Sequence, residues 1–354
     1  MNLRGKVAVA MSGGVDSSVA AALLVNQGAD VFGVMMRLWG EDGAVNRCCS
    51  PEDVAGARRV AGSLGIPFYV VDMQDAFRQH VVAGFLSDYA QGVTPNPCME
   101  CNRYIRWTRL LADVLALGAR YLATGHYARV EQRAGKHVLL RGVDPMKDQS
   151  YVLSVLGQEA LARAIFPLGE LTKHQVRDYA RQSGLAVAER PESQDLCFLA
   201  GEDYRTFLHR HGSDGFSPGP ILDTVGNSLG QHQGLPAYTI GQRRGIGVSA
   251  EEPLYVLAKD VVANALIVGP RQSLGRTSFR TLPANWVSEE PPDDRIEAEV
   301  QVRYRAPVVT CEVSLLGGGA TEVRLARPLP DITPGQSAVF YRDELCLGAA
   351  VIAE

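Results

Sequence analysis

The sequence predicts an α/β protein, with an N-terminal doubly wound parallel sheet followed by two small β-rich domains, the last of them a β-barrel. Three observations lead to this prediction. Apolar runs alternate with amphipathic stretches up to about residue 130, a glycine turn follows the first apolar run, and short β-like runs replace the helical pattern after residue 211. The domain boundaries that we expect are 1–210, 211–275 and 276–354.

The first strand is expected at Val7–Met11, and a helix is expected to follow the glycine turn. Apolar side chains recur at helical spacing from Val15 to Leu23, and Gly28 ends the pattern. Further strands are expected at Val31–Met36, Phe68–Val71 and Tyr121–Thr124, and further helices at Pro51–Leu64, Asp75–Gln91, Asn102–Leu117, Gln158–Ile165 and Lys173–Ser183. Strands that alternate with helices form a parallel sheet, which binds ligands at the carboxyl ends of its strands.

The chain changes character near residue 211. A stretch rich in glycine and proline, His211–Pro220, is typical of a linker. Beyond it lie β-like runs separated by turns, at Leu254–Leu257, Ala265–Val268, Ile296–Tyr304 and Ala338–Tyr341. Two small β-rich domains that meet near Arg276 explain this pattern.

Composition indicates a globular protein with no membrane span. Of the 354 residues, 46% are hydrophobic and 21% are charged, and no apolar run is long enough to cross a bilayer. The chain shows no secretion signal, so the expected location is the cytoplasm. The net charge of −4 gives no bulk attraction for nucleic acid. Seven cysteines without a secretion signal favour metal, redox or nucleophilic use over a disulfide scaffold.

The run Ser12-Gly13-Gly14-Val15-Asp16-Ser17-Ser18 follows the first strand directly. Two adjacent glycines let the backbone approach an anion, toward which the N–H groups of the turn and of the helix N-terminus point. The run has no Lys-Ser/Thr and is therefore not a Walker A loop. A phosphate chain would fit here. Asp16 is acidic where an anion should bind, so we expect it to hold Mg²⁺ or to position the loop.

A second informative segment is Thr94–Asn102, which contains a CxxC pair. Asn96 suits the N-cap and Pro97 the first helical position, so Cys98 and Cys101 should share a face in the first turns of a helix. A helix N-terminus stabilises a thiolate, and either cysteine could then act as a nucleophile or as a metal ligand. Half of a structural zinc site and two buried thiols are the alternatives; no second CxxC or HxxxH occurs.

Cys197 is a third candidate thiol, although an isolated cysteine is usually a small core residue. The other four cysteines are not candidates. Cys48 and Cys49 are adjacent and are not expected to pair with each other, and Cys311 and Cys346 lie in β-like runs where packing explains them.

Together these segments resemble the tRNA-specific 2-thiouridylases, which are N-type ATP pyrophosphatases. The matching motifs follow the family's order over nearly the whole chain: Ser12–Ser17, Thr94–Asn102, Ala123–Tyr127, Leu140–Tyr151, Phe166–Glu170, Gln194–Phe198, Tyr238–Gly245, Arg303–Arg305 and Pro334–Gln336. The resemblance implies sulfur-for-oxygen exchange at O2 of the wobble uridine (position 34) of tRNAs for Lys, Glu and Gln. ATP would activate O2 by adenylation, and sulfur would then displace AMP at C2.

The same resemblance implies the site residues. ATP with Mg²⁺ would occupy Ala10, Met11, Ser12, Gly13, Gly14, Val15, Asp16 and Ser17, with Met36 and Gly125 on the adenosine side. The target base would lie near Asn96, Pro97 and Cys98, and the tRNA anticodon stem-loop would contact His126, Lys147, Asp148, Gln149, Arg303, Tyr304, Arg305 and Gln336. Taken singly, these residues have plainer explanations: a core methionine, a turn glycine, a strand-end histidine, a surface ion pair for Lys147 and Asp148, and a solvated strand face for Arg303 and Arg305.

By the family analogy Cys101 is the nucleophile or acid–base partner and Cys197 carries a persulfide, with a disulfide closing between them after sulfur release. The chain also has Cys98 where some relatives have Asp. Three thiols could hold a [4Fe–4S] cluster with an open iron that binds hydrosulfide, and the CxxC form favours this route. The sulfur donor, sulfide or a persulfide-relay protein, stays open.

Two other functions remain alternatives. One is a related ATP pyrophosphatase that thiolates another RNA base or acts on a small molecule. The other is a nucleotide-binding module in which Cys98 and Cys101 hold a structural zinc ion.

Overall fold

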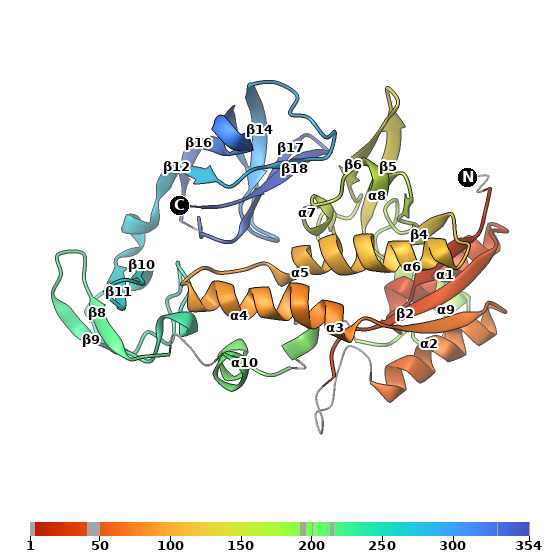
Figure 1. Cartoon of the computed structure of the whole chain (residues 1–354), viewed down its shortest axis with the longest axis horizontal. Helices are drawn as coiled ribbons and strands as arrows, with labels where there is room; N and C mark the ends of the chain where they lie inside the picture. Colours follow the sequence, from red (N-terminus) through yellow and green to blue (C-terminus); the bar gives the residue numbers. More distant parts are fainter. Residues whose placement is uncertain are drawn as a thin grey trace.

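The computed structural model describes residues 4–40, 50–191, 196–199, 201–212, 216–330 and 332–353. Figure 1 shows a domain of strands and helices at one end of the molecule, a small β domain at the opposite end, and a larger β domain beside both. Cys48, Cys49, Gln194 and Asp195 lie outside the described residues.

The parallel sheet of the N-terminal domain is confirmed. Its described strands are β1 (Val7–Ala10), β2 (Val31–Arg37), β3 (Phe68–Asp72), β4 (Tyr121–Ala123) and β7 (Ala164–Ile165), in the order β3-β2-β1-β4-β7. Neighbouring strands are all parallel, and Val9 pairs with both Gly33 and Ala123. The helix expected at Gln158–Ile165 is confirmed only in its first half. Helix α8 comprises Gln158–Leu161, and Ala164–Ile165 form β7.

Helices cover both faces of this sheet, as a doubly wound fold requires. Alternate residues of β1 enter different cores: Ala8 packs with the helices on one face, and Val7 and Val9 pack with those on the other. The helices packed on Val7 and Val9 are α1 (Val15–Asn26), α2 (Pro51–Ser63) and α9 (Lys173–Gln182).

Two long helical segments cover the opposite face. The first comprises α3 (Gln74–Phe77), the π-helical stretch Arg78–Val82 and α4 (Ala83–Ala90). The second comprises α5 (Pro97–Glu100), the π-helical stretch Cys101–Leu110 and α6 (Leu111–Ala116). The sequence pattern predicts both helices but not their π-helical turns, which are rare and often occur at functional sites.

The C-terminal domain closes into a barrel. Its strands are β12 (Arg276–Thr281), β13 (Asn285–Trp286), β14 (Arg295–Gln301), β15 (Val309–Leu315), β16 (Thr321–Leu329), β17 (Ser337–Arg342) and β18 (Leu345–Val351). The sheet runs β12-β16-β15-β14-β17-β18, and a bridge between Thr281 and Ile352 joins its two ends. The strand expected at Ile296–Tyr304 ends earlier, at Gln301.

A hairpin from the N-terminal half extends this C-terminal sheet. β5 (Ala128–Arg133) and β6 (Lys136–Arg141) pair with each other, and β6 pairs with β18 through Leu139 and Leu140. Neither strand is predicted from the sequence. The pairing joins two parts of the chain that lie 200 residues apart, and it fixes the barrel beside the parallel sheet.

The central domain is a four-stranded sheet in the order β10-β11-β8-β9. Its strands are β8 (Gly219–Leu222), β9 (Ser228–His232), β10 (Tyr255–Asp260) and β11 (Ala265–Gly269). The short helices not yet named are α7 (Ser150–Leu153), α10 (Tyr204–His211) and the 3₁₀ turns at Cys197–Leu199, Leu235–Ala237, Arg271–Leu274 and Gly317–Gly319.

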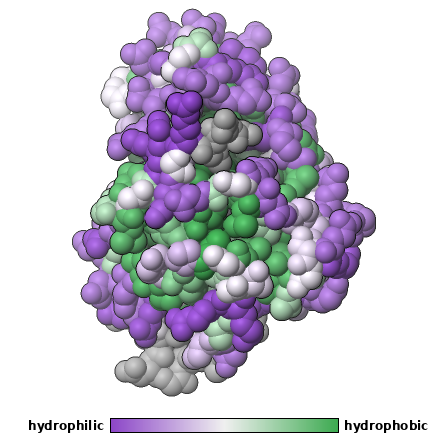
Figure 2. Space-filling model, turned by 90° about the vertical axis from the view of Figure 1, so that its right-hand side faces the viewer, coloured by the Kyte–Doolittle hydropathy of each residue, from purple (hydrophilic) through white to green (hydrophobic). Residues whose placement is uncertain are grey.

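No described helix has both the length and the apolar character needed to cross a membrane. In Figure 2, hydrophobic residues gather in the middle of the end face of the molecule and hydrophilic residues surround them. The parallel-sheet domain forms that end of the molecule in Figure 1. Its edge strand β3 leaves Tyr69 and Val70 exposed.

Candidate active site

The glycine turn leads from β1 into α1 as the sequence predicts. The Ser12 N–H donates to Ser17 Oγ at 3.1 Å, and Ser18 Oγ donates to the Gly14 carbonyl at 2.8 Å. Gly13 has φ +76°, and a Cβ there would lie 2.9 Å from the Asp53 carbonyl oxygen, so glycine is required. Within the described residues, the backbone N–H groups from Gly13 to Ser17 have no acceptor. These N–H groups at the start of α1 can bind an anion.

Asp16 is held by residues from two other segments. Both carboxylate oxygens accept from Lys173 Nζ, at 2.7 and 2.8 Å, and Oδ1 also accepts from the Tyr127 hydroxyl at 2.8 Å. Gly125 lies against the same turn, since a Cβ there would be 2.8 Å from the Asp16 carbonyl carbon and from the Ser17 nitrogen. The loop is therefore packed closely against the chain that follows β4.

Arg190 braces the other side of the loop. Its Nη1 donates to the Gly13 carbonyl at 2.9 Å, and its Nη2 pairs with the buried carboxylate of Asp53. Asp53 also completes the capping box of α2 with Ser50. Because Arg190 comes shortly before Cys197 in the chain, the contact links the loop to the segment that carries this thiol.

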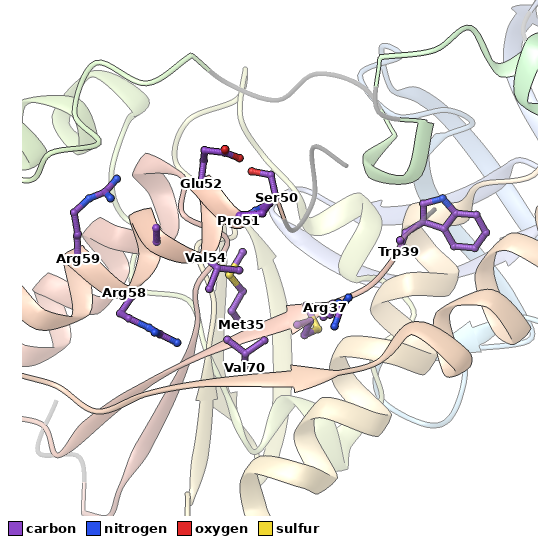
Figure 3. Close-up of a pocket in the computed structure, with 13 residues that line it drawn as sticks. Met35, Arg37, Trp39, Ser50, Pro51, Glu52, Val54, Arg58, Arg59 and Val70 are labelled. Atoms are coloured by element: carbon purple, nitrogen blue, oxygen red, sulfur yellow. The ribbon is translucent and has the colours of Figure 1, made fainter. Parts of the chain in front are cut away.

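A cavity of about 950 Å³ opens between the end of β2 and the start of α2 (Figure 3). Met36, the residue expected on the adenosine side, lines it, and Val54, Met35 and Val70 gather in its middle. Three cations, Arg37, Arg58 and Arg59, stand around this apolar lining. Gly125 does not line this cavity, because it packs on the loop instead.

Cys98 lies in α5, whose first residue is Pro97 as predicted, and Cys101 begins the π-helical stretch that follows. Cys98 is exposed to solvent and Cys101 is buried. Burial raises the pKa of the Cys101 thiol to about 11, against a lowering by Arg106. Burial and the thiols of Cys197 and Cys101 raise the pKa of Cys98 to about 12. We call the region around Cys98, Cys101 and Cys197 the recess.

The expected stabilisation of a thiolate at this helix N-terminus is therefore wrong. The first helical segment is only four residues long, Asn96 makes no side-chain cap, and desolvation outweighs the effect of the helix dipole. The mutual pKa effects of Cys98, Cys101 and Cys197 indicate that the structure brings the three predicted thiols into one neighbourhood.

The π-helical stretch places one cation against the thiols. Arg106 donates to Asn102 Oδ1 at 2.7 Å, and Asn102 Nδ2 donates to the Cys98 carbonyl at 3.0 Å. In a π-helix the hydrogen bonds join residues five positions apart, so Arg106 lies one helical turn after Cys101 on the same side of the helix. Burial, with the charge of Arg106, holds the pKa of His126 well below its usual range, so the imidazole is neutral; its Nδ1 lies 2.7 Å from Thr124 Oγ1.

The barrel holds the segment that precedes the CxxC pair. Gln336 Nε2 donates to the carbonyls of Thr94 and Pro95, both at 3.0 Å, and the Thr94 N–H donates to Pro334. Gln336 is 8% exposed, so its side chain is committed to this loop, whereas the sequence predicts an RNA contact. Asn96 bonds to the hydroxyl of Tyr151 rather than capping the helix.

Arg303, Tyr304 and Arg305 lie on a turn after β14 and not on a strand face. Both arginines are exposed, and the Arg305 guanidinium lies 5.3 Å from the Tyr304 ring centre. Burial raises the pKa of the Tyr304 hydroxyl. Arg305 lowers this pKa, and Asp148 and Cys98 raise it by smaller amounts. The turn therefore lies near the recess that contains Cys98.

In the Lys147–Gln149 segment, Asp148 and Gln149 form hydrogen bonds with the backbone and so support the local fold. Asp148 Oδ1 accepts from the N–H groups of Gly142 and Ser150, both at 3.0 Å. Gln149 exchanges two hydrogen bonds with the backbone of Tyr127, at 2.8 and 3.0 Å. Lys147 is half-buried beside them.

The three thiols do not form a metal site as they are arranged. A cluster needs cysteine thiolates grouped around one centre. Over the described ranges, which include Cys98, Cys101 and Cys197, no three His, Cys, Asp or Glu side chains could hold a metal ion. As they stand, the three thiols therefore do not form a site for a single metal ion.

Sequence reasoning missed four residues of this site: Arg106, Tyr127, Lys173 and Arg190. Arg106 lies close to Arg103 and Arg109 in the sequence, and such a basic cluster is usually explained as solvated charge on a helix. Tyr127 and Lys173 each fall inside or beside a motif, but no local pattern pairs them with Asp16. Only the tertiary structure reveals these contacts.

Comparisons with known proteins agree with this architecture. Three family models match in order: a tRNA methyl transferase HUP domain over residues 5–201, a tRNA methyl transferase PRC-barrel domain over 205–270, and an aminomethyltransferase beta-barrel domain over 276–352. The chain is 49% identical to the tRNA-specific 2-thiouridylase MnmA of Roseiflexus castenholzii, over 98% of this chain and 99% of the relative. It belongs to the tRNA-specific 2-thiouridylase family.

A second relative, the enzyme of the same name from Chloroflexus aurantiacus, is also 49% identical, with 98% of each chain covered. Among solved structures, the chain is similar to the U34-tRNA thiolase NcsA from Methanococcus maripaludis with its [4Fe-4S] cluster. That likeness has a TM-score of 0.36 and 20% identity, and covers 58% of this chain and 64% of the other.

Proposed function

We propose that this chain is an ATP-dependent tRNA-uridine 2-sulfurtransferase that exchanges O2 of the wobble uridine for sulfur in tRNAs for Lys, Glu and Gln. The observation that carries the proposal is a series of neighbouring groups that leads from the phosphate loop toward the thiols. Gly125 packs on the loop backbone, the next residue is His126, and Arg106 acts on His126 as well as on Cys98 and Cys101. A base bound in the recess would lie between the nucleotide and the sulfur.

The first step uses the phosphate loop. O2 of the uracil attacks the α-phosphorus of ATP, the bond to the bridging oxygen breaks, and pyrophosphate leaves with that electron pair. The free N–H groups from Gly13 to Ser17 stabilise the charge on the leaving pyrophosphate. The neighbouring cavity, with Met36 in its lining, takes the adenosine. Mg²⁺ enters with ATP; we assign Asp16 to positioning because its oxygens already accept from Lys173 and Tyr127.

The second step uses the thiols. A persulfide on Cys197, supplied by a persulfide-relay protein or formed with sulfide and an oxidant, attacks C2 of the adenylated base, and AMP leaves. The Cys101 thiol then attacks the inner sulfur of Cys197, which breaks the sulfur–sulfur bond and releases 2-thiouridine. Cys101 and Cys197 are left as a disulfide, which a dithiol reductant reopens. We prefer this route to the cluster because it needs only Cys101 and Cys197, and because no group of three His, Cys, Asp or Glu side chains among the described residues could hold a metal ion as they stand.

The tRNA anticodon stem-loop would approach the recess from the barrel side. Arg303 and Arg305 are exposed cations on a turn near Cys98, and Lys147 and His126 lie on neighbouring segments. Contacts of cations with RNA phosphates make binding weaken with salt. We assign residues 1–210 to catalysis, 211–275 to a central domain and 276–354 to tRNA contact, and we place the protein in the cytoplasm with its tRNA substrates. No relative described above favours another RNA base or a small molecule.

The test is a thiolation assay on two preparations of the full chain, one iron-free and one reconstituted anaerobically with iron and sulfide. Each is incubated with unmodified tRNA, Mg-ATP, a persulfide donor and a dithiol reductant, and 2-thiouridine is measured by mass spectrometry. We expect product from the iron-free preparation. Product only after reconstitution would overturn the persulfide route, and no product from either would overturn the assigned activity.

A further inference from the structure

The phosphate loop contains a carboxylate at the place where it should bind an anion. Asp16 lies in the first turn of α1, beside the N–H groups that are free to receive phosphate. An unneutralised carboxylate there would oppose a triphosphate, because like charges a few ångströms apart repel strongly when they are partly desolvated. The loop therefore needs a cation that acts on Asp16 itself.

Lys173 is that cation. Its Nζ lies 2.7 Å from one oxygen of Asp16 and 2.8 Å from the other, and its side chain is 12% exposed while that of Asp16 is 33% exposed. The Tyr127 hydroxyl occupies a further position on Oδ1, and the Tyr127 ring centre lies 6.0 Å from Nζ. These contacts hold the carboxylate of Asp16 in place and neutralise its charge.

The position of Lys173 is fixed from outside the loop. It is the first residue of α9, whose N-terminus is closed by a capping box between Thr172 and Gln175. Its backbone N–H donates to Asp144 Oδ2 at 2.9 Å, and α9 packs against α1 in the same hydrophobic core. An anchored helix end can therefore present the ammonium group with little loss of side-chain freedom.

We propose that Lys173 is a positioning residue for nucleotide binding, which neutralises and orients Asp16 so that the N–H groups of the loop present an unopposed positive potential to the triphosphate. The inference rests on the proposed function, since it assumes that the loop binds ATP. It gives Lys173 a role that acts through Asp16 and not through direct contact with phosphate.

The test is a rescue experiment on ATP binding. The dissociation constant for Mg-ATP is measured by calorimetry on the full chain for wild type, Lys173→Met, Asp16→Asn and the double variant, with Lys6→Met as an exposed-lysine control. We expect Lys173→Met to weaken binding about ten- to a hundredfold, and removal of the opposing charge in the double variant to restore most of that loss. Lys173→Arg should retain most of the affinity, and Lys6→Met should match wild type.

Each outcome decides the inference. A double variant as weak as Lys173→Met would overturn it, because Lys173 would then contact phosphate itself or only support the fold. Unchanged binding in Lys173→Met would overturn it as well. A wild type that binds no ATP would overturn both this inference and the proposed function, whereas normal ATP binding and rescue without any thiolation would overturn the proposed function alone.

Discussion

The phosphate loop and the thiol recess are built in opposite ways. Seven consecutive residues from Ser12 to Ser18 form the loop, and most of its internal hydrogen bonds join residues three to five positions apart. The recess combines Cys98 and Cys101 with Cys197 and with a turn of the barrel more than 200 residues away. The loop is braced by more distant residues such as Lys173 and Arg190, but these belong to the N-terminal domain as well. The difference teaches that the nucleotide site is built within one domain, whereas the sulfur chemistry depends on correct assembly of separate domains.

The largest expected effect is a loss of thiolation without a loss of ATP binding, which would distinguish the function of the recess from that of the loop. Replacement of Cys197 by alanine should reduce 2-thiouridine formation by more than about a thousandfold, because no persulfide can form, while ATP affinity stays at the wild-type value. Thiolation is followed by mass spectrometry and ATP binding by calorimetry. Cys311→Ala, which removes a buried thiol in the barrel core, is the matched control and should retain thiolation. Loss of ATP binding in Cys197→Ala would show that the two regions are not separable.

The next effect tests close packing at the loop. Gly125→Ala places a methyl group 2.8 Å from the backbone of Asp16 and Ser17, so the loop must shift. We expect ATP affinity to fall about tenfold and the free energy of unfolding to fall by about 1–3 kcal/mol. Gly84→Ala is the control, since its Cβ meets nothing within 4 Å and α4 should gain slightly in stability. Equal ATP affinity in the two variants would contradict the packing argument.

A smaller effect tests the assembled region through Gln336. Gln336→Ala removes two hydrogen bonds to the segment before Cys98, so thiolation should fall about tenfold while ATP affinity stays unchanged. The Cys98 thiol should also react faster with iodoacetamide, because its segment is held less firmly. Gln132→Ala, at an exposed position of β5, serves as control. A rise in KM for tRNA without any change at Cys98 would indicate the RNA contact that the sequence predicts.

The smallest expected effect concerns the free energy of unfolding and a residue outside both regions, Lys259. Burial lowers the pKa of Lys259 in the central domain to about 8, below its ordinary value of 10.5. The unfolded chain therefore binds more protons between pH 8 and 10.5, and the penalty for charging Lys259, full below pH 8, is relieved as the pH rises through this window. Lys259→Met should raise the free energy of unfolding at pH 7 by about 1–2 kcal/mol, and the gain should vanish near pH 10.5. Urea unfolding at several pH values measures it, and a gain that is independent of pH would contradict the assignment.

Prediction from the sequence succeeds where structure is local. Strand β1, the glycine turn and helix α1 follow from apolar spacing and from the conformational freedom of Gly13. The breaker-rich stretch and the β-like runs indicate the β-rich C-terminal half. The hairpin β5–β6 is missed because its strands are short and polar, and because its pairing with β18 is formed only in the tertiary structure.

The recess shows the limit of local reasoning. Helix-dipole reasoning predicts low thiol pKa values for Cys98 and Cys101, but desolvation in the assembled protein reverses the sign. Gln336 is expected at an RNA surface, yet it is buried against the carbonyls of Thr94 and Pro95. The pairing of Asp16 with Lys173 joins residues 157 positions apart, which no sequence spacing encodes.

Amide hydrogen exchange in wild type and Gln336→Ala tests the central claim most directly. It reports separately on the Ser12–Ser18 loop and on the Thr94–Cys101 segment, whose Thr94 N–H donates to Pro334 of the barrel. The account predicts that the variant loses protection in Thr94–Cys101 alone, while the phosphate loop exchanges as in wild type. Equal loss of protection in both segments, or no loss in Thr94–Cys101, would contradict the account of a loop built within the N-terminal domain beside a recess that the barrel helps to assemble.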